Sequence, residues 1–100
     1  MKVFLDDERD TPEGWTRCYW PEEAITLLQS GQVTHLSLDH DLGEVGDGAR
    51  TGYDVVVWIE EQVALNGFEP PEISVHSSNT SATARMKQGI ASIRNLRDRR

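Results

Sequence analysis

Three short apolar runs, each ending abruptly in an acidic or polar residue, constrain this chain more than any other feature. Apolar runs of this length are typical of buried strands. A carboxylate directly after such a run marks the end of the buried part, because a charged group is not buried without a partner. In an open parallel sheet, binding sites form where the carboxyl ends of strands meet. The three run ends are therefore predicted to share one edge of a parallel sheet. The runs are residues 3–5, 36–38 and 73–75, followed by Asp6, Asp39 and His76.

The segments between these runs predict one further strand and three helices. Residues 15–19 would place Trp15, Arg17 and Tyr19 on one face of a strand and Thr16 and Cys18 on the other. They are predicted to form a short edge strand. Apolar residues at helical spacing, with proline at a helix start and glycine beyond a helix end, predict the helices. These run from Pro21 to just before Gly31, over residues 53–66, and from a cap at Asn79 or Ser81 to about Leu96.

Strands that alternate with helices of this length predict a parallel sheet with right-handed crossovers. The fold is therefore predicted to be α/β and three-layered, with a four-stranded parallel sheet of order 2-1-3-4. Residues 6–14 carry Pro12 and Gly14 and are predicted to form a loop without a helix. Residues 1–100 are expected to form one domain, whose basic end at 97–100 frays.

Charge is distributed unevenly along the chain. Residues 1–80 hold 16 acids against 4 Lys or Arg, whereas residues 81–100 hold 6 Lys or Arg against 1 acid. The acidic bulk argues against binding of duplex DNA, which requires a basic surface. The basic end is interpreted as a solvated helix face, with docking on an anionic partner as the alternative. Cys18 is the single cysteine, and no apolar run reaches about 18 residues, so we expect a cytoplasmic protein without disulfides or a membrane span.

Four aspartates that follow the first two of the three apolar runs form a candidate metal site. Carboxylate oxygens suit Mg²⁺ or Mn²⁺, and these cations also bind phosphate oxygens. Four like charges repel one another, so their convergence requires a divalent cation or a raised carboxyl pKa. Capping of a strand end is the simpler interpretation of one acidic pair, but a second acidic cluster after another strand favours the cation. The four residues are Asp6, Asp7, Asp39 and Asp41.

Candidate proton carriers and phosphate contacts lie near these acids. His40 and His76 titrate near neutral pH and are candidates for a general acid or base. Hydroxyl and amide donors follow His76, and this arrangement suits a phosphate. A serine-histidine-aspartate triad is also conceivable, but no Gly-x-Ser-x-Gly nucleophile elbow supports it. The candidate phosphate-binding residues are Ser77, Asn79, Arg9 and Arg85.

The three strand ends resemble those of response-regulator receiver domains. Residues 3–8 resemble the first strand of that family and its Mg²⁺-binding acidic pair, and residues 36–39 resemble the third strand with its phospho-accepting aspartate. Residues 73–78 resemble the fourth strand, which ends in a hydroxyl residue that contacts the phosphoryl group. The resemblance implies that Ser77 is this hydroxyl residue. Loop 8–14 stands in place of the family's first helix, and its fifth strand and lysine have no counterpart here.

Taken whole, the chain is similar to a compact, flavodoxin-like derivative of receivers, the cyclic-phosphate-processing receiver domains. The similarity spans nearly all of the chain. It implies metal-dependent processing of cyclic phosphates in nucleotide-signalling, RNA-repair or phage-conflict settings. The matching segments are residues 5–9, 38–43, 51–54 and 75–79, together with Arg85-Met86.

Two functions are compatible with these patterns. The first is a phosphoesterase that uses Mg²⁺ or Mn²⁺ to act on a cyclic or terminal phosphate of a nucleotide or RNA end. The second is a receiver-like module that binds a phosphorylated ligand or a protein partner without turnover. The histidines favour the enzyme, whereas the missing lysine and the small domain favour the module. In the enzyme, Asp6, Asp7 and Asp39 would hold the metal, His76 or His40 would move the proton, and Ser77, Asn79 and Arg9 would hold the phosphoryl oxygens.

Overall fold

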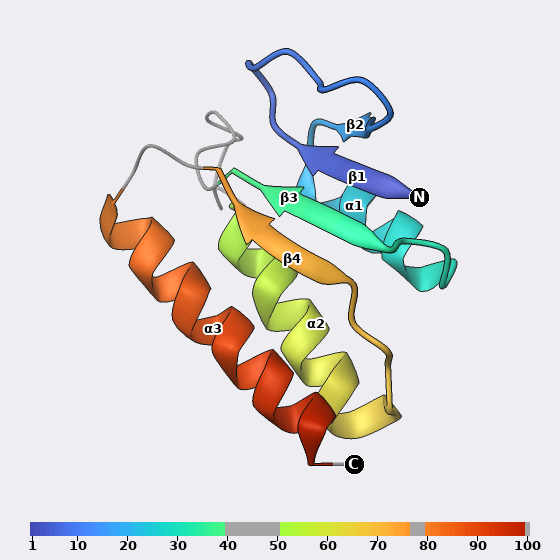
Figure 1. Cartoon of the computed structure of the whole chain (residues 1–100), viewed down its shortest axis with the longest axis vertical. Helices are drawn as coiled ribbons and strands as arrows, with labels where there is room; N and C mark the ends of the chain where they lie inside the picture. Colours follow the sequence, from blue (N-terminus) through green and yellow to red (C-terminus); the bar gives the residue numbers. More distant parts are fainter. Residues whose placement is uncertain (40–50, 77–79, 100) are drawn as a thin grey trace.

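The structure is a computed structural model and describes residues 1–39, 51–76 and 80–99. Within these ranges, four strands form one sheet in the order β2-β1-β3-β4, and every neighbouring pair is parallel (Figure 1). The predicted α/β class, strand order and parallel pairing are thereby confirmed. The elements are β1 (Lys2–Leu5), β2 (Thr16–Cys18), α1 (Pro21–Gln29), β3 (His35–Leu38), α2 (Gly52–Asn66), β4 (Glu72–Val75) and α3 (Thr80–Asp98).

The strand register aligns the apolar residues of the sheet on one face. Leu36 of β3 pairs with Val3 of β1 and with Ile73 of β4, and Leu38 pairs with Leu5. Because successive side chains of a strand point to opposite faces, these five residues share a face. They are buried in one cluster with side chains from all three helices. The helix residues of this cluster are Ala24, Leu28, Val55, Val56, Ile59, Val63, Met86, Ile90 and Ile93.

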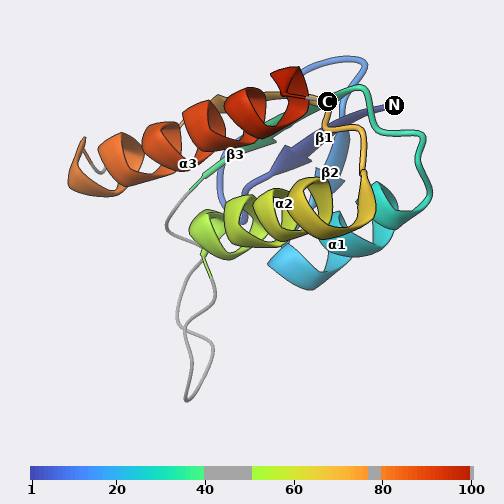
Figure 2. The ribbon, with the colours of Figure 1, turned by 90° about the horizontal axis from the view of Figure 1, so that it is seen from below.

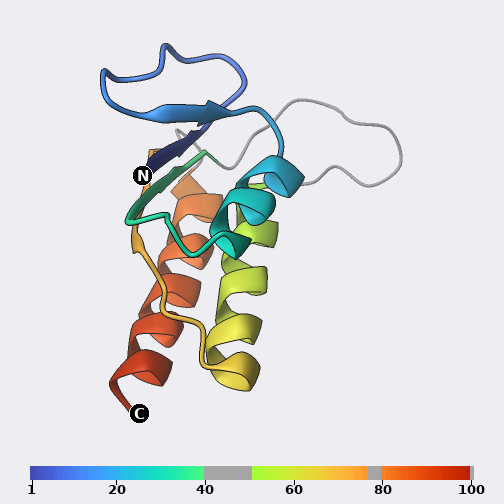
Figure 3. The ribbon, with the colours of Figure 1, turned by 90° about the vertical axis from the view of Figure 1, so that its right-hand side faces the viewer.

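The described elements form two layers, and this corrects the expectation of three. Figures 2 and 3 show α1 and α2 on the same side of the sheet, and α3 lies alongside α2. No described helix covers the other face, to which Phe4, Ser37 and Ser74 point by alternation. The reason lies in the link from β1 to β2, because it carries Pro12 and Gly14 and contains no helix that could cross that face.

A small aromatic cluster covers part of this second face instead. The ring of Phe4 stacks on the imidazole of His76 at 4.3 Å between centroids, and it meets Trp15 edge-on at 6.3 Å. The ammonium group of Lys2 lies 5.7 Å from the centre of the Trp15 ring. As a result, Phe4 is 7% exposed although it lies on the face without helices. His76 thus belongs to the packing of this face as well as to the edge of the sheet.

Helix α2 is capped at both ends and is set close to the end of β3. The Oγ1 of Thr51 accepts a hydrogen bond from the Tyr53 N–H, and Asp54 accepts one from the Thr51 N–H, which together make a capping box. Gly67 ends the helix at φ 65°, a conformation that glycine adopts without strain. A Cβ at Gly52 would collide with the backbone carbonyl of Asp39, so the first turn of α2 rests directly on this residue.

Two further observations bear on the predictions. Cys18 is buried in β2, which forms an edge of the sheet, as predicted. Among the helices in the described part of the chain, none combines the length and the apolar character needed to cross a lipid bilayer.

Candidate functional site

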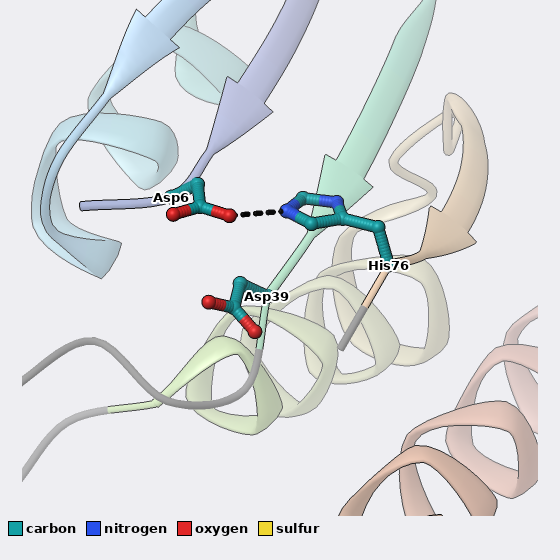
Figure 4. A group of neighbouring side chains, drawn as sticks. All are labelled: Asp6, Asp39 and His76. Carbon is teal, nitrogen blue, oxygen red and sulfur yellow. Dashed lines mark hydrogen bonds and ion pairs between the residues drawn. The ribbon is translucent and has the colours of Figure 1, made fainter. Parts of the chain in front are cut away.

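Three residues stand side by side at the carboxyl edge of the sheet, one position beyond β1, β3 and β4. The backbone N–H of Asp39 donates to the Leu5 carbonyl at 3.0 Å, and the N–H of His76 donates to the Leu38 carbonyl at 2.9 Å. These bonds continue the parallel ladders, so Asp6, Asp39 and His76 share one register position. One ligand atom from each of the three lies within 4.8 Å of the others (Figure 4).

Both carboxylates of this group are removed from solvent. Asp6 is fully buried and Asp39 is 9% exposed. Burial of a charged carboxylate is strongly unfavourable unless hydrogen bonds or opposite charges compensate for it. A pair of buried, neighbouring carboxylates at a strand end is therefore an arrangement that stability alone would not favour, and a bound cation would relieve it.

The hydrogen bonds of Asp6 keep this residue ionised. Its Oδ1 accepts the backbone N–H groups of Glu8 and Arg9 at 2.8 and 2.9 Å, and its Oδ2 lies 3.0 Å from Nε2 of His76. Burial by itself would raise the pKa of Asp6, but the hydrogen bonds from Arg9, Glu8 and His76 outweigh it and lower that pKa below the ordinary 3.8. Of the two expected ways to accommodate converging acids, a divalent cation or a raised pKa, the second therefore does not apply to Asp6.

His76 is held between two hydrogen-bonding partners. Its Nδ1 lies 2.6 Å from Oγ of Ser37, and its Nε2 faces Asp6. Burial lowers the pKa of His76 below 6.5, against the opposing influence of the carboxylates of Asp6 and Asp39. A neutral ring fits both contacts, because Nε2–H then donates to Asp6 while Nδ1 accepts the hydroxyl proton of Ser37.

The side chain of Arg9 links the residues that follow β1 and β4. Its Nη1 donates a hydrogen bond to the backbone carbonyl of His76 and lies 3.8 Å from Oδ2 of Asp6. Its side chain remains 44% exposed, so much of the guanidinium group faces solvent beside the buried acids. Of the predicted phosphate-binding residues, Arg9 is the one that the described structure brings to the cluster.

The other predicted residues divide into two groups. Asp7 is half-buried but is not part of the Asp6, Asp39 and His76 group, and Arg85 is exposed on α3 and is not part of it either. The remaining predicted site residues lie outside the described ranges, and the structure does not place them. These are His40, Asp41, Ser77 and Asn79.

Ser37 and Phe4 are the residues of the site that sequence reasoning missed. Both lie inside apolar runs, where they read as members of a strand. A signal was nevertheless present, because Ser37 is a hydroxyl residue between two leucines. Alternation sends Leu36 and Leu38 to the core and Ser37 to the opposite face, two residues before Asp39. A polar residue at that spacing is positioned to orient a site side chain.

The donor set of the cluster fits a divalent cation. Two carboxylates suit Mg²⁺ and Mn²⁺ alike, and Mn²⁺ accepts an imidazole more readily than Mg²⁺ does. If Nε2 of His76 were to act as a ligand, the ring proton would move to Nδ1. The Ser37 hydroxyl could then accept from Nδ1 instead of donating to it, because a hydroxyl group does both.

Comparisons with known proteins give one match. A family model described as "Cyclic-phosphate processing Receiver domain" matches residues 1–92. Neither the curated proteins nor the solved structures that were searched gave a significant match. The matched range contains all four strands and the three residues of the cluster.

Proposed function

The chain belongs to the cyclic-phosphate processing receiver domains, and on this basis we propose that it is a metal-dependent phosphoesterase acting on a cyclic or terminal phosphate. The observation that carries the proposal is the buried group of Asp6, Asp39 and His76 at the carboxyl edge of the sheet. Two buried acids supply a place for a cation, and a histidine within 4.8 Å of them supplies a group that titrates. Phosphate ester cleavage uses these two components.

The proposed cofactor is Mg²⁺ or Mn²⁺, held by Asp6 and Asp39. When bound, it would polarise a phosphoryl oxygen and neutralise charge that develops in the reaction. Asp6 is well prepared for this role, because its backbone and imidazole contacts fix the carboxylate and keep it ionised. Asp39 is fixed from another direction, because the start of α2 packs against its backbone at Gly52.

His76 is the proposed proton carrier, at Nε2. Asp6 orients this nitrogen, and Ser37 holds the opposite side of the ring. Because the Ser37 hydroxyl can donate to Nδ1 or accept from it, the ring can change tautomer without losing that hydrogen bond. Stacking on Phe4 keeps the ring plane in place during such an exchange. A positioned and reversible proton donor of this kind is what cleavage of a phosphate ester requires.

Arg9 is the proposed contact for the phosphoryl oxygens, because its half-exposed guanidinium group lies beside Asp6. Ser77 and Asn79 are proposed for the same role, from their place directly after His76 in the sequence. The proposed substrate is a nucleotide or RNA end, in a nucleotide-signalling, RNA-repair or phage-conflict setting in the cytoplasm. Duplex DNA and a membrane are not proposed as partners.

A single-turnover assay with 2′,3′-cyclic and 3′,5′-cyclic nucleotides tests this proposal. With Mn²⁺ or Mg²⁺ at saturation, the wild-type protein is expected to open the cyclic phosphate, and Asp39→Asn is expected to abolish turnover. Glu61→Gln, an exposed change on α2, is the matched control and should retain activity. Binding of the nucleotides without any turnover in the wild type would favour the alternative function, a module that binds a phosphorylated ligand.

A further inference from the structure

The row of residues at the carboxyl edge continues from the acidic cluster onto β2. The backbone N–H of Asp6 donates to the Cys18 carbonyl at 3.1 Å, in the same pattern that links Asp39 to β1 and His76 to β3. This bond gives Tyr19 the register position of Asp6. The row across the sheet therefore reads Tyr19, Asp6, Asp39 and His76, from one edge strand to the other.

The ring of Tyr19 lies on the face of the sheet that no described helix covers. Cys18 points to the helical core, as Leu5 does, whereas Arg17 pairs with Phe4 and points to the other face. The guanidinium carbon of Arg17 lies 5.2 Å from the centre of the Tyr19 ring, so Tyr19 is on the face of Arg17. The imidazole of His76 is on this face too, because it stacks on Phe4.

Tyr19 is both exposed and held in place. It is 47% exposed. Glu23 accepts the backbone N–H groups of Tyr19 and Trp20 at 3.2 Å, and Arg17 under the ring donates from Nε to Thr11 Oγ1 at 2.7 Å. One face of the ring is thus covered by a fixed guanidinium group, and the residue's exposure leaves room on the other.

We propose that Tyr19 is a stacking platform for the base of a nucleotide whose phosphate lies at Asp6 and Asp39. The inference rests on the proposed function and adds a base-binding subsite to it. Neighbouring strands are about 5 Å apart, so the backbone of Tyr19 lies about 5 Å from that of Asp6 and about 10 Å from that of Asp39 along the row. A ribose bridges this kind of span between a phosphate and its base. Aromatic rings stack on any base, so the platform selects nucleotides over phosphates without a base, and does not select one base.

The test compares two compounds that share the reacting group. One is a 2′,3′-cyclic nucleotide, and the other is ethylene glycol cyclic phosphate, which has the five-membered cyclic phosphate and no base. Affinity for each is measured in the presence of Mn²⁺ for the wild type, Tyr19→Ala and Tyr19→Phe. Tyr19→Ala is expected to weaken nucleotide binding by about 5- to 150-fold and to leave binding of the base-free compound unchanged. Tyr19→Phe is expected to bind both compounds as the wild type does.

A second aromatic residue supplies the matched control. Tyr53 is 39% exposed at the start of α2, and Tyr53→Ala is expected to leave the nucleotide preference intact. The platform is refuted if Tyr19→Ala weakens both compounds equally, if it weakens neither, or if the preference depends on Tyr53 instead. Failure of the proposed function is read from the single-turnover assay instead, because a wild type that binds the nucleotide without turnover fails as an enzyme and still tests the platform. A wild type that binds neither compound overturns both proposals. Equal melting temperatures of the three Tyr19 proteins establish that each is folded.

Discussion

Nε2 of His76 lies 3.0 Å from Oδ2 of Asp6, although 70 residues separate the two in the chain. Strand β3 lies between their strands, so the imidazole reaches across β3, where Ser37 holds its other nitrogen. The parallel register produces this contact, because it places the first residue after each strand in a single row. The contact joins the residue that follows β1 to the residue that follows β4. His76 therefore belongs both to the site and to the packed surface of the sheet.

Binding of Mn²⁺ or Mg²⁺ is expected to raise the melting temperature of the wild-type protein. A ligand that binds only the native state stabilises it by about 2.7 kcal/mol at one hundred times its dissociation constant. Asp39→Asn should abolish this increment and raise the stability of the metal-free protein, because it removes one of two neighbouring buried charges. Thermal unfolding with EDTA and with titrated metal measures both effects.

The matched control for the metal experiment is Glu61→Gln, which removes an exposed charge on α2. This variant is expected to keep the metal-dependent increment. Equal increments in wild type and Asp39→Asn would contradict a cation site at this edge of the sheet.

Replacement of His76 by Gln is expected to reduce turnover of a cyclic phosphate by about 10²- to 10⁴-fold, the usual contribution of a positioned proton carrier. Ligand affinity should change far less, by about 0.5–1.5 kcal/mol, the net value of one hydrogen bond. Single-turnover rates and equilibrium binding separate the two effects. Full activity in His76→Gln would remove His76 from the proposed role and transfer it to His40.

The stability of the metal-free protein is expected to fall as the pH is lowered from neutral. The pKa of His76 is lowered below 6.5 in the folded protein by burial, so on acidification the unfolded chain binds a proton before the native state does. The pKa of Asp6 is also lowered, below 3.8, because its hydrogen bonds outweigh burial, which adds a second loss at lower pH. Denaturant unfolding in EDTA at a series of pH values measures the slope. His76→Gln should remove the part of the slope that begins near pH 6.5, and a slope unchanged in that variant would count against a buried, neutral His76.

Gly52→Ala is expected to destabilise the protein by about 1–3 kcal/mol, the usual result of overpacking. The added Cβ would meet the Asp39 carbonyl and would lie 2.9 Å from Cε of Met86, so α2 or the end of β3 must shift. Because Asp39 would move, the metal-dependent increment should also shrink, although Gly52 has no side chain to bind a cation. Denaturant unfolding with and without Mn²⁺ tests this prediction, and an unaltered metal response would show that the close approach does not position Asp39.

Cys18 is expected to resist alkylation in the folded protein. Burial in β2, with a smaller contribution from the charge of Glu23, raises the pKa of its thiol to about 11. The reactive thiolate is therefore scarce near pH 8, and the thiol is also shielded. Labelling with iodoacetamide should be slow and should accelerate when denaturant opens the sheet. Rapid labelling of the native protein would contradict the burial of β2 against α1.

Much of the fold follows from local features of the sequence. Apolar runs ending in acids mark β1 and β3, and Pro21 and Gly67 mark helix ends through their own backbone preferences. These signals depend on residues close together in the chain, so the strand order and parallel pairing could be derived from their succession. The prediction that Asp6 and Asp39 lie at the same edge of the sheet rests on the same order of strands and helices along the chain.

Only the tertiary structure decided which polar side chains share the site. Asp6 and Asp7 are equivalent in sequence, but the backbone turns between them, so Asp6 joins the buried cluster and Asp7 does not. In the sequence, Ser37 is indistinguishable from an ordinary strand residue. The strand register places it beside His76, which is 39 residues away in the chain. The two-layer arrangement was likewise decided by packing. The apolar residues of all three helices pack against the face of the sheet to which Val3 points. Sequence periodicity defines the apolar face of each helix, but the side of the sheet that this face covers depends on contacts between residues far apart in the chain.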